Sequence, residues 1–197
     1  MQVSIIIGLK YNNGVVLAAD KQVTYDNIKN DNATKIFKSK YSNTAMGIAG
    51  CCRTLDLIFA NTEELMDYKD ILDNVEMDLK YVINVVITDM FKLLDKYGCL
   101  YRENNIVNTY GEYIVASDDK IFNIFSNGAV IENDTFGVIG CGFQLVKGYL
   151  DGIHYDSKTI NKEKAIQIVT TCIKQCCKDD VFINDNIDFI ILEKEDA

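Results

Sequence analysis

The chain has 197 residues, of which 48% are hydrophobic and 25% are charged, so a single domain over residues 1–197 can bury a sizeable core. Its formal net charge of -9 disfavours nucleic acid as a partner, because binding to a phosphate backbone depends on clustered Lys and Arg. The first apolar run, Ile5 to Leu9, is broken by Gly8 and has no basic segment before it. The sequence therefore predicts neither a signal peptide nor a membrane span, and we expect a cytoplasmic protein without a membrane partner.

The first predicted elements form a β-hairpin. Strand-like runs cover residues 4–10 and 14–21, and Asn12-Asn13-Gly14 lies between them. An Asn-Gly turn between two β-branched runs is a strong short-range signal for an antiparallel hairpin. Such a return brings Asp20 back towards Ser4, at the start of the first strand. Two further strands are predicted at 35–38 and 44–49.

The rest of the chain alternates between helical and strand-like periodicity. Apolar residues recur at helical spacing over 54–68 and 75–97, and Gly98 is the predicted C-cap of the second helix. Strands follow at 113–116, 120–126 and 135–139, then helices at 143–150 and 162–177, and a last strand at 187–193. Strands in groups, separated by helices, indicate an α+β fold in which helices cover the outside of antiparallel sheets.

Few side chains are candidates for catalysis. His154 is the only histidine, so a multi-histidine metal site is impossible and any Ser-His pair would have to use it. It falls in the predicted loop 152–155 between two helices, where a solvated histidine is the simpler interpretation. A hydroxyl nucleophile on the first residue of a chain needs no histidine. Its own α-amine, with an unperturbed pKa of about 7.7–8.0, can serve as the general base.

The seven cysteines are expected to be reduced thiols, because their number is odd and no secretory segment is predicted. Cys172, Cys176 and Cys177 fall on the predicted helix 162–177, where we expect them to pack as small hydrophobic residues. The short Cys-x-x-Cys loops typical of metal clusters are absent from the sequence. We therefore expect no metal and no cofactor.

Several sequence blocks resemble one family. They are Gly14-Val-Val-Leu-Ala-Ala-Asp20, Gln22-Val23-Thr24, Lys35-Ile36-Phe37 and Ala45-Met46-Gly47-Ile48-Ala49-Gly50, in matching order and spacing. In these blocks the chain resembles a proteasome β-type subunit, including the bacterial ring-protease relatives, of the N-terminal-nucleophile hydrolases. Weaker likeness continues through Gly140-Cys141-Gly142 and Asp180 to Ile187-Asp188-Phe189. The resemblance implies a four-layer αββα sandwich.

The resemblance also implies the catalytic roles. Ser4 falls on the threonine that is freed as the first residue of the mature protein, where its hydroxyl is the nucleophile and its amine the base. Asp20 and Lys35 fall on the supporting aspartate and lysine, with Lys35 easing deprotonation and Asp20 holding Lys35. The Gly50 N–H corresponds to the oxyanion donor.

Further site residues follow from the same resemblance. Cys141 stands where the family usually has a serine between two glycines, and Ile183 replaces another serine after Asp180. Those positions help to orient the terminal amine. The positions that line the substrate side-chain pocket correspond to Val23, Ile48 and Cys52, and the backbone of Thr24 would pair with an extended substrate.

The segment before Ser4 is Met1-Gln2-Val3, which this interpretation makes a short propeptide. The glycine that usually precedes the cleaved bond in β-type precursors is absent. Removal of Met1 alone would leave Gln2 and Val3, so an active enzyme requires cleavage between Val3 and Ser4.

The leading prediction is a peptidase that cleaves peptide or protein substrates through Ser4 after self-processing. Three alternatives stay open at this point: a noncatalytic ring or assembly protein, an amidase of small molecules, and a ligase in which an amine replaces water at the acyl-enzyme. We expect a homo-oligomer that assembles through its outer helices, and the resemblance makes this a ring. The sequence does not identify an ATPase or cap partner.

Overall fold

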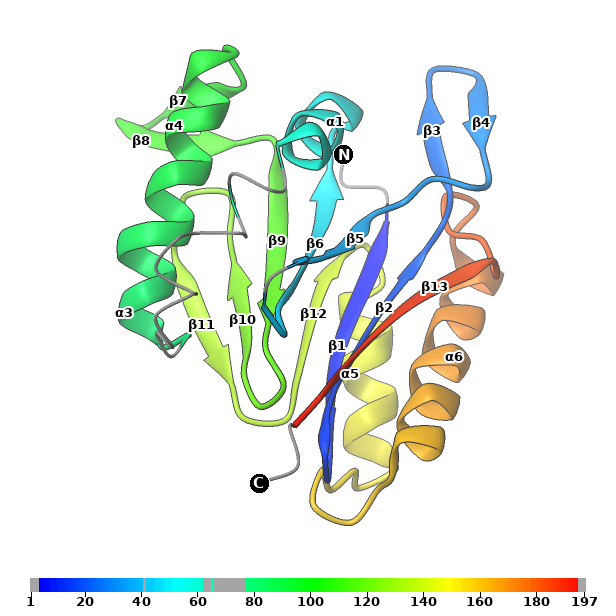
Figure 1. The fold of residues 1–197 in the computed structure, drawn as a ribbon. Helices are drawn as coiled ribbons and strands as arrows, with labels where there is room; N and C mark the ends of the chain where they lie inside the picture. The colour runs from blue at the N-terminus through cyan, green and yellow to red at the C-terminus, as the bar shows by residue number, and fades with distance from the viewer. Residues whose placement is uncertain (1–3, 41, 62–64, 66–76, 195–197) are drawn as a thin grey trace.

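The computed structural model describes residues 4–40, 42–61, 65 and 77–194. Two antiparallel sheets lie face to face, with helices on their outer sides (Figure 1). The first sheet consists, in spatial order, of β12 (Phe136–Gly140), β1 (Ile5–Tyr11), β2 (Gly14–Asp20) and β13 (Ile187–Glu193). The second consists of β11 (Val130–Asn133), β10 (Ile121–Ile124), β9 (Gly111–Ala116), β6 (Ala45–Gly50) and β5 (Ile36–Lys38).

Strand β1 is buried on both faces. Successive side chains of a strand point to opposite faces, so Ile5, Ile7 and Leu9 share one face and Ile6 lies on the other. The first three pack with the helices α5 (Phe143–Gly152) and α6 (Lys162–Asp179). Ile6 packs with residues of the second sheet. This double burial explains why the run is almost continuously apolar.

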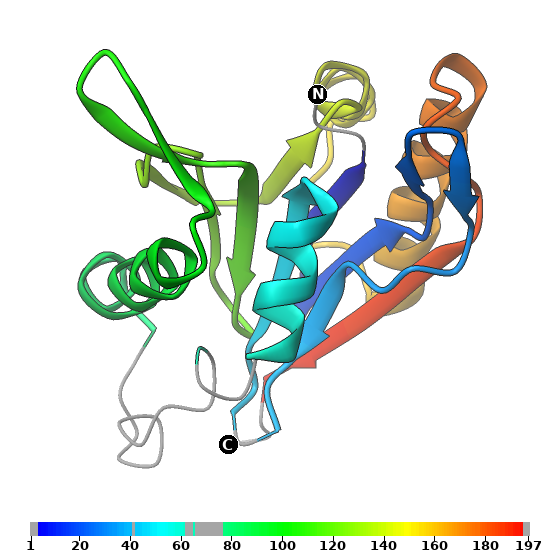
Figure 2. The same cartoon turned by 90° about the horizontal axis from the view of Figure 1, so that it is seen from above.

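Helices also cover the outer face of the second sheet. α1 (Cys52–Ala60), the π-helical turn η2 (Val82–Ile87) and α4 (Thr88–Lys96) pack against side chains such as Met46, Tyr113 and Phe122. A third apolar layer fills the space between the two sheets. Helix, sheet, sheet and helix follow one another across the molecule (Figure 2), which confirms the αββα prediction.

The predicted hairpin is confirmed. Asn12 and Asn13 form its two-residue loop, and Tyr11 pairs with Gly14. The register continues to Ile6 opposite Ala19, so Asp20 returns to the level of Ile5. The turn at one end of the hairpin therefore fixes the position of Asp20 at the other.

Two helix predictions need adjustment. Helix α1 begins at Cys52 and ends at Ala60, earlier than the predicted 54–68, and residues 62–64 and 66–68 lie outside the described part. The described part of the predicted helix 75–97 consists of α3 (Leu79–Tyr81), η2 and α4. Gly98, with a φ of +64°, directly follows the C-cap residue Tyr97, so this glycine ends the helix as predicted but lies one position beyond the cap.

The sequence prediction missed five short strands. Two of them, β3 (Val23–Tyr25) and β4 (Ile28–Asn30), form one separate hairpin, and β7 (Leu100–Glu103) and β8 (Ile106–Thr109) form another. The fifth is the edge strand β11. β3, β4, β7 and β11 contain no buried residue, and the buried residues of β8, Asn108 and Thr109, are polar, so no buried apolar face imposes the alternation of apolar and polar residues that marks a strand in a sequence.

The outer helices α5 and α6 test the predictions for the cysteines and for His154. Cys172 and Cys176 of α6 are buried in the core and the partly buried Cys177 packs against it, which confirms the prediction that they pack as hydrophobic residues. His154 is exposed between α5 and α6, as predicted. Among the described helices, none is both long enough and apolar enough to cross a membrane.

Candidate active site

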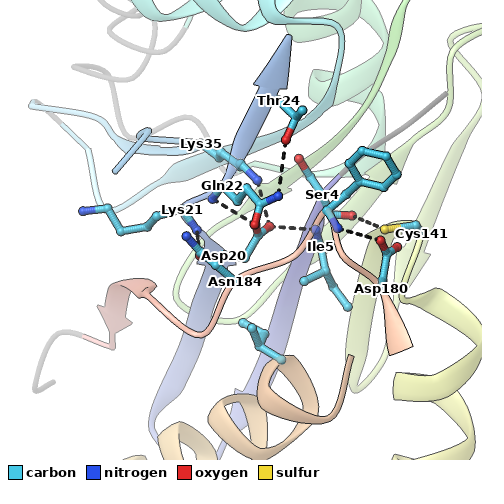
Figure 3. Close-up of polar contacts among 12 residues, drawn as sticks. Ser4, Ile5, Asp20, Lys21, Gln22, Thr24, Lys35, Cys141, Asp180 and Asn184 are labelled. Atoms are coloured by element: carbon cyan, nitrogen blue, oxygen red, sulfur yellow. Dashed lines mark hydrogen bonds and ion pairs between the residues drawn. The ribbon is translucent and has the colours of Figure 1, made fainter. Parts of the chain in front are cut away.

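Asp20 is the centre of the polar network at the end of β2. Its side chain is fully buried, with an exposed fraction of 0%. Oδ1 accepts hydrogen bonds from Lys35 Nζ at 2.8 Å and from the backbone N–H of Ile5 at 3.0 Å, and Oδ2 accepts from the N–H of Gln22 at 3.0 Å (Figure 3). One carboxylate oxygen thus ties the lysine to the chain immediately after Ser4.

Lys35 is also buried, with an exposed fraction of 1%, and it directly precedes β5. Its backbone carbonyl accepts from the N–H of Ile48, which fixes the strand against β6. Burial lowers the pKa of Lys35 below its ordinary value, while the adjacent Asp20 carboxylate opposes that change. A proton-binding group with a lowered pKa in a closed site is typical of a catalytic centre.

Ser4 lies next to this pair, at the entrance to β1, and is 4% exposed. Its backbone carbonyl accepts a hydrogen bond from the Cys141 N–H at 3.0 Å, and the Cys141 thiol lies 3.3 Å from the same oxygen. The loop that follows β12 therefore holds Ser4 through its main chain, independently of its side chain.

Two glycines let the loop after β12 pack closely against Ser4 and Ile5. Gly140 has a φ of +93°, and a Cβ there would lie 2.0 Å from the Ser4 carbonyl oxygen. A Cβ on Gly142 would lie 2.1 Å from Ile5 Cδ1. Both clashes are with residues at the start of β1, so this Gly-Cys-Gly segment has the residues that its position requires.

We expect Gly140→Ala to displace Ser4. The left-handed backbone alone costs about 1–3 kcal/mol for a residue with a side chain, and the clash with the Ser4 carbonyl adds to it. The melting temperature and the rate of peptide turnover should both fall. Gly148→Ala is the matched control, because Gly148 lies in α5 and no neighbouring atom lies within 4 Å of the position that an added methyl group would take. Native turnover in Gly140→Ala would show that the loop does not position Ser4.

Asp180 lies beside Cys141 (Figure 3). It is the C-cap of α6, and its Oδ1 accepts from the N–H of Phe182 at 2.9 Å. Burial, followed by the interaction with Asp180, raises the pKa of the Cys141 thiol to about 11. The thiol is therefore protonated at neutral pH, and a protonated thiol can donate to the Ser4 carbonyl.

A cavity of about 270 Å³ opens beside Ser4. Six of the residues predicted for the site line it: Ser4, Val23, Thr24, Ile48, Gly50 and Cys52. Tyr25, Cys51, Arg53 and Leu55 complete the lining. Asp20, Lys35, Cys141 and Asp180 do not line this cavity, and the first two are buried behind it. The wall is mostly apolar, which suits a side chain of moderate size.

Gly50 ends β6 at the edge of the cavity, where it pairs with Gly111 of β9. A Cβ at this position would lie 2.4 Å from the Tyr110 carbonyl oxygen and 2.6 Å from the Gly111 Cα. Because both neighbours are backbone atoms, they cannot move aside easily. Any side chain at position 50 would thus disturb the strand end that lines the cavity.

The sequence prediction assigned no role to Gln22. This residue is 2% exposed, and its Nε2 donates to the Val181 carbonyl at 2.9 Å and to Thr24 Oγ1 at 3.2 Å. Its backbone N–H binds Asp20, as described above. Gln22 therefore connects the buried ion pair to β3 and to the segment that follows α6. The only sequence signal that could have identified Gln22 was its place in the Gln22-Val23-Thr24 block that resembles the family.

Comparison with known proteins agrees with this geometry. The family model described as "Proteasome subunit" matches residues 3–192. The chain is 26% identical to proteasome subunit beta 2 of Korarchaeum cryptofilum, over 98% of this chain and 92% of that protein. It is 24% identical to proteasome subunit beta 1 of Desulfurococcus amylolyticus, over 95% and 88% of the two chains.

The solved structures give the same result for the fold. The crystal structure of eukaryotic HslV from Trypanosoma brucei matches with a TM-score of 0.67 and 21% identity, and the match covers 96% of this chain and 99% of that one. At this identity the likeness concerns the fold alone. The family model covers nearly all of the sequence, and the similar curated proteins are β subunits; this chain belongs to the proteasome subunit family, as a β-type member.

Proposed function

We propose that this protein is an N-terminal-nucleophile peptidase in which Ser4, freed by cleavage of the Val3–Ser4 bond, attacks peptide amides. The observation that carries the proposal is the buried Asp20–Lys35 pair, which is tied to the chain at Ile5 and lies beside an apolar cavity that Ser4 lines. Burying two charges is costly, and a structural role alone gives little reason to keep them at the mouth of a cavity.

Processing would come first. The Ser4 hydroxyl attacks the Val3 carbonyl carbon, the Val3–Ser4 amide nitrogen leaves as the new α-amine, and water then hydrolyses the ester to release residues 1–3. The product is a serine that carries its hydroxyl and its base on one residue.

Substrate cleavage repeats this chemistry on another chain. The α-amine of Ser4 takes the hydroxyl proton, and the oxygen attacks the substrate carbonyl. The Lys35 charge, held by Asp20, favours the developing negative charge on the serine oxygen, while the Gly50 N–H donates to the oxyanion. The amine then gives its proton to the leaving nitrogen. Water finally hydrolyses the acyl-enzyme and restores Ser4.

Cys141 and Asp180 would position the nucleophile. Cys141 binds the Ser4 carbonyl, and the carboxylate of Asp180 is close enough to raise the pKa of the Cys141 thiol. In this proposal a thiol takes the place of the serine that the family usually has at position 141. The Asp180 carboxylate helps to keep that thiol protonated, so the thiol can donate to the Ser4 carbonyl and hold the main chain that carries the terminal amine.

The proposed substrate is an extended peptide or unfolded protein segment. Val23, Ile48 and Cys52 would surround its side chain on the acyl side of the cleaved bond, and the backbone of Thr24 would pair with its main chain. The relatives are subunits of proteasomes, so we further propose a ring of copies of this chain that acts in the cytoplasm. The relatives do not define a cap or ATPase partner for it.

The cavity predicts a side-chain preference that can be altered. Cys52→Phe should fill part of the 270 Å³ cavity and lower kcat/KM for peptides with Leu or Phe before the cleaved bond by roughly 10–100-fold, with a smaller loss for Ala. Cys52→Ala is the control, because it leaves the cavity open. Parallel kcat/KM measurements on three fluorogenic peptides provide the test. If Cys52→Phe lowered kcat/KM equally for the Leu, Phe and Ala peptides, the substrate side chain would bind outside this cavity.

Peptide length distinguishes this function from hydrolysis of small amides. If the Thr24 backbone binds an extended chain, a tetrapeptide amide should have a higher kcat/KM than the amide of its last residue alone. We expect the difference to exceed tenfold. Equal rates for both substrates, both dependent on Ser4, would instead support an amidase of small molecules.

A further inference from the structure

The β3–β4 hairpin carries an exposed apolar patch at its tip. Tyr25 and Ile28 pair directly across the two strands, so their side chains lie on the same face, and their exposed fractions are 66% and 72%. The two strands belong to neither main sheet, and an isolated two-stranded hairpin is only marginally stable in water. Its tip therefore has the character of a surface that another protein surface covers.

A groove of about 630 Å³ lies between α4 and the β7–β8 hairpin. We call it the α4 groove. Its apolar lining comes from Ile87 and Phe91 on one side and from Leu100 and Val107 on the other. It contains none of the residues proposed for catalysis. Both views show the β3–β4 hairpin and the α4–β7–β8 region on opposite flanks of the molecule (Figures 1 and 2).

The charges of the two surfaces are complementary. Asp26 is exposed at the hairpin tip, between Tyr25 and Ile28 in the sequence. The α4 groove carries two basic residues, Lys92 and Arg102, and one acidic residue, Asp95. Lys92 is already paired with Asp89 of its own helix, at 2.8 Å. Within the described residues, neither Asp26 nor Arg102 has an ion-pair partner.

We propose that the β3–β4 hairpin of one copy of this chain docks in the α4 groove of the next copy. Tyr25 and Ile28 then cover the apolar lining of the groove, and Asp26 pairs with Arg102 of the neighbour. The inference concerns assembly and does not depend on the proposed catalytic activity. It also replaces the general expectation of contacts between outer helices with one defined pair of surfaces.

The type of contact has a consequence for symmetry. The hairpin and the groove are different surfaces on different flanks, so each bound copy still offers one free hairpin and one free groove. Such a head-to-tail contact continues until it closes into a ring, or else grows into a filament. Tyr25 also lines the Ser4 cavity, so each contact would lie at the edge of a proposed active site.

Charge reversal provides the test, with the full chain in sedimentation velocity over micromolar concentrations. We expect wild-type protein to associate, and Asp26→Arg and Arg102→Glu each to raise the dissociation constant at least tenfold. Each variant then has two like charges at every contact. An equimolar mixture of the two variants has only opposite charges when the copies alternate, so the mixture should associate again. Recovery on mixing separates a direct contact from misfolding.

Two further variants complete the experiment. Ile28→Ser removes half of the apolar patch without changing the Ser4 cavity, and should also weaken association. Lys174→Glu places a charge change on the exposed side of α6 and should leave association unchanged. Wild-type protein that stays monomeric, or a mixture that fails to associate although both variants unfold at the wild-type temperature, would overturn the proposal. Loss of association in Lys174→Glu alone would assign the contact to α6 instead.

Discussion

Replacement of Ser4 by alanine is expected to abolish both release of residues 1–3 and cleavage of peptide amides. The change removes one oxygen atom, which is the nucleophile in the first step of both self-processing and substrate cleavage. Loss of a nucleophile lowers kcat by roughly a thousandfold or more. The fold should persist, because the contacts that hold residue 4 to Cys141 use its backbone carbonyl.

The measurement combines turnover of a fluorogenic peptide, intact mass and thermal unfolding. Ser126→Ala is a suitable control, because Ser126 is in the turn between β10 and β11 and does not line the Ser4 cavity. We expect this control to behave like wild-type protein. Turnover by Ser4→Ala at a rate near that of wild type would exclude Ser4 as the nucleophile.

Replacement of Lys35 by alanine should remove activity and also destabilise the protein. From its position in the sequence alone, a lysine at the catalytic end of a strand predicts a loss of activity without unfolding, because it is expected to support charge and not packing. In the structure both Lys35 and Asp20 are buried, at 1% and 0% exposure, and the bond between them is 2.8 Å long. Removing the lysine leaves a buried carboxylate without its counter-charge, at a cost of about 3–5 kcal/mol.

For a chain of this size, that cost corresponds to a fall in Tm of roughly 6–20 °C. Lys38→Ala is the matched control, since Lys38 is exposed on β5, and its removal should cost less than about 0.5 kcal/mol. The double variant Lys35→Met/Asp20→Asn replaces the ion pair with uncharged groups of similar size. It should recover much of the stability but none of the activity. Full activity in the double variant would show that the ion pair serves stability alone.

The fold was predictable from the sequence because its central strands are long and bounded by clear turns. The Asn12-Asn13-Gly14 segment predicts the hairpin that returns Asp20 to Ser4, and Gly98 marks the end of α4. The β3–β4 hairpin was not predicted, because neither of its strands has a buried residue and the sequence therefore lacks the alternation of apolar and polar residues that marks a strand. The resemblance named Val23 and Thr24 as substrate-binding positions, and the structure adds that β3, together with Tyr25, forms one wall of the cavity beside Ser4.

The contacts within the candidate site were also not predictable from local sequence patterns. The resemblance named the residues, but it could not give the burial of Lys35, because that depends on segments far apart in the sequence. The steric need for Gly140 likewise arises from a contact with Ser4, 136 positions earlier in the chain. Gln22 went without a role for this reason, since its partner Val181 belongs to the segment after α6. Local patterns in a sequence do not record such long-range contacts.

Mass spectrometry of active protein tests the central proposal most directly. The purified protein is treated with a peptide-like β-lactone, an electrophile that acylates hydroxyl nucleophiles, and both the N-terminus and the site of modification are determined. We predict a chain that begins at Ser4 and carries the acyl group on Ser4, with no adduct in Ser4→Ala. Protein that retains Met1 while it cleaves peptides, or an adduct on any other residue, would contradict the assignment of Ser4 as a freed N-terminal nucleophile.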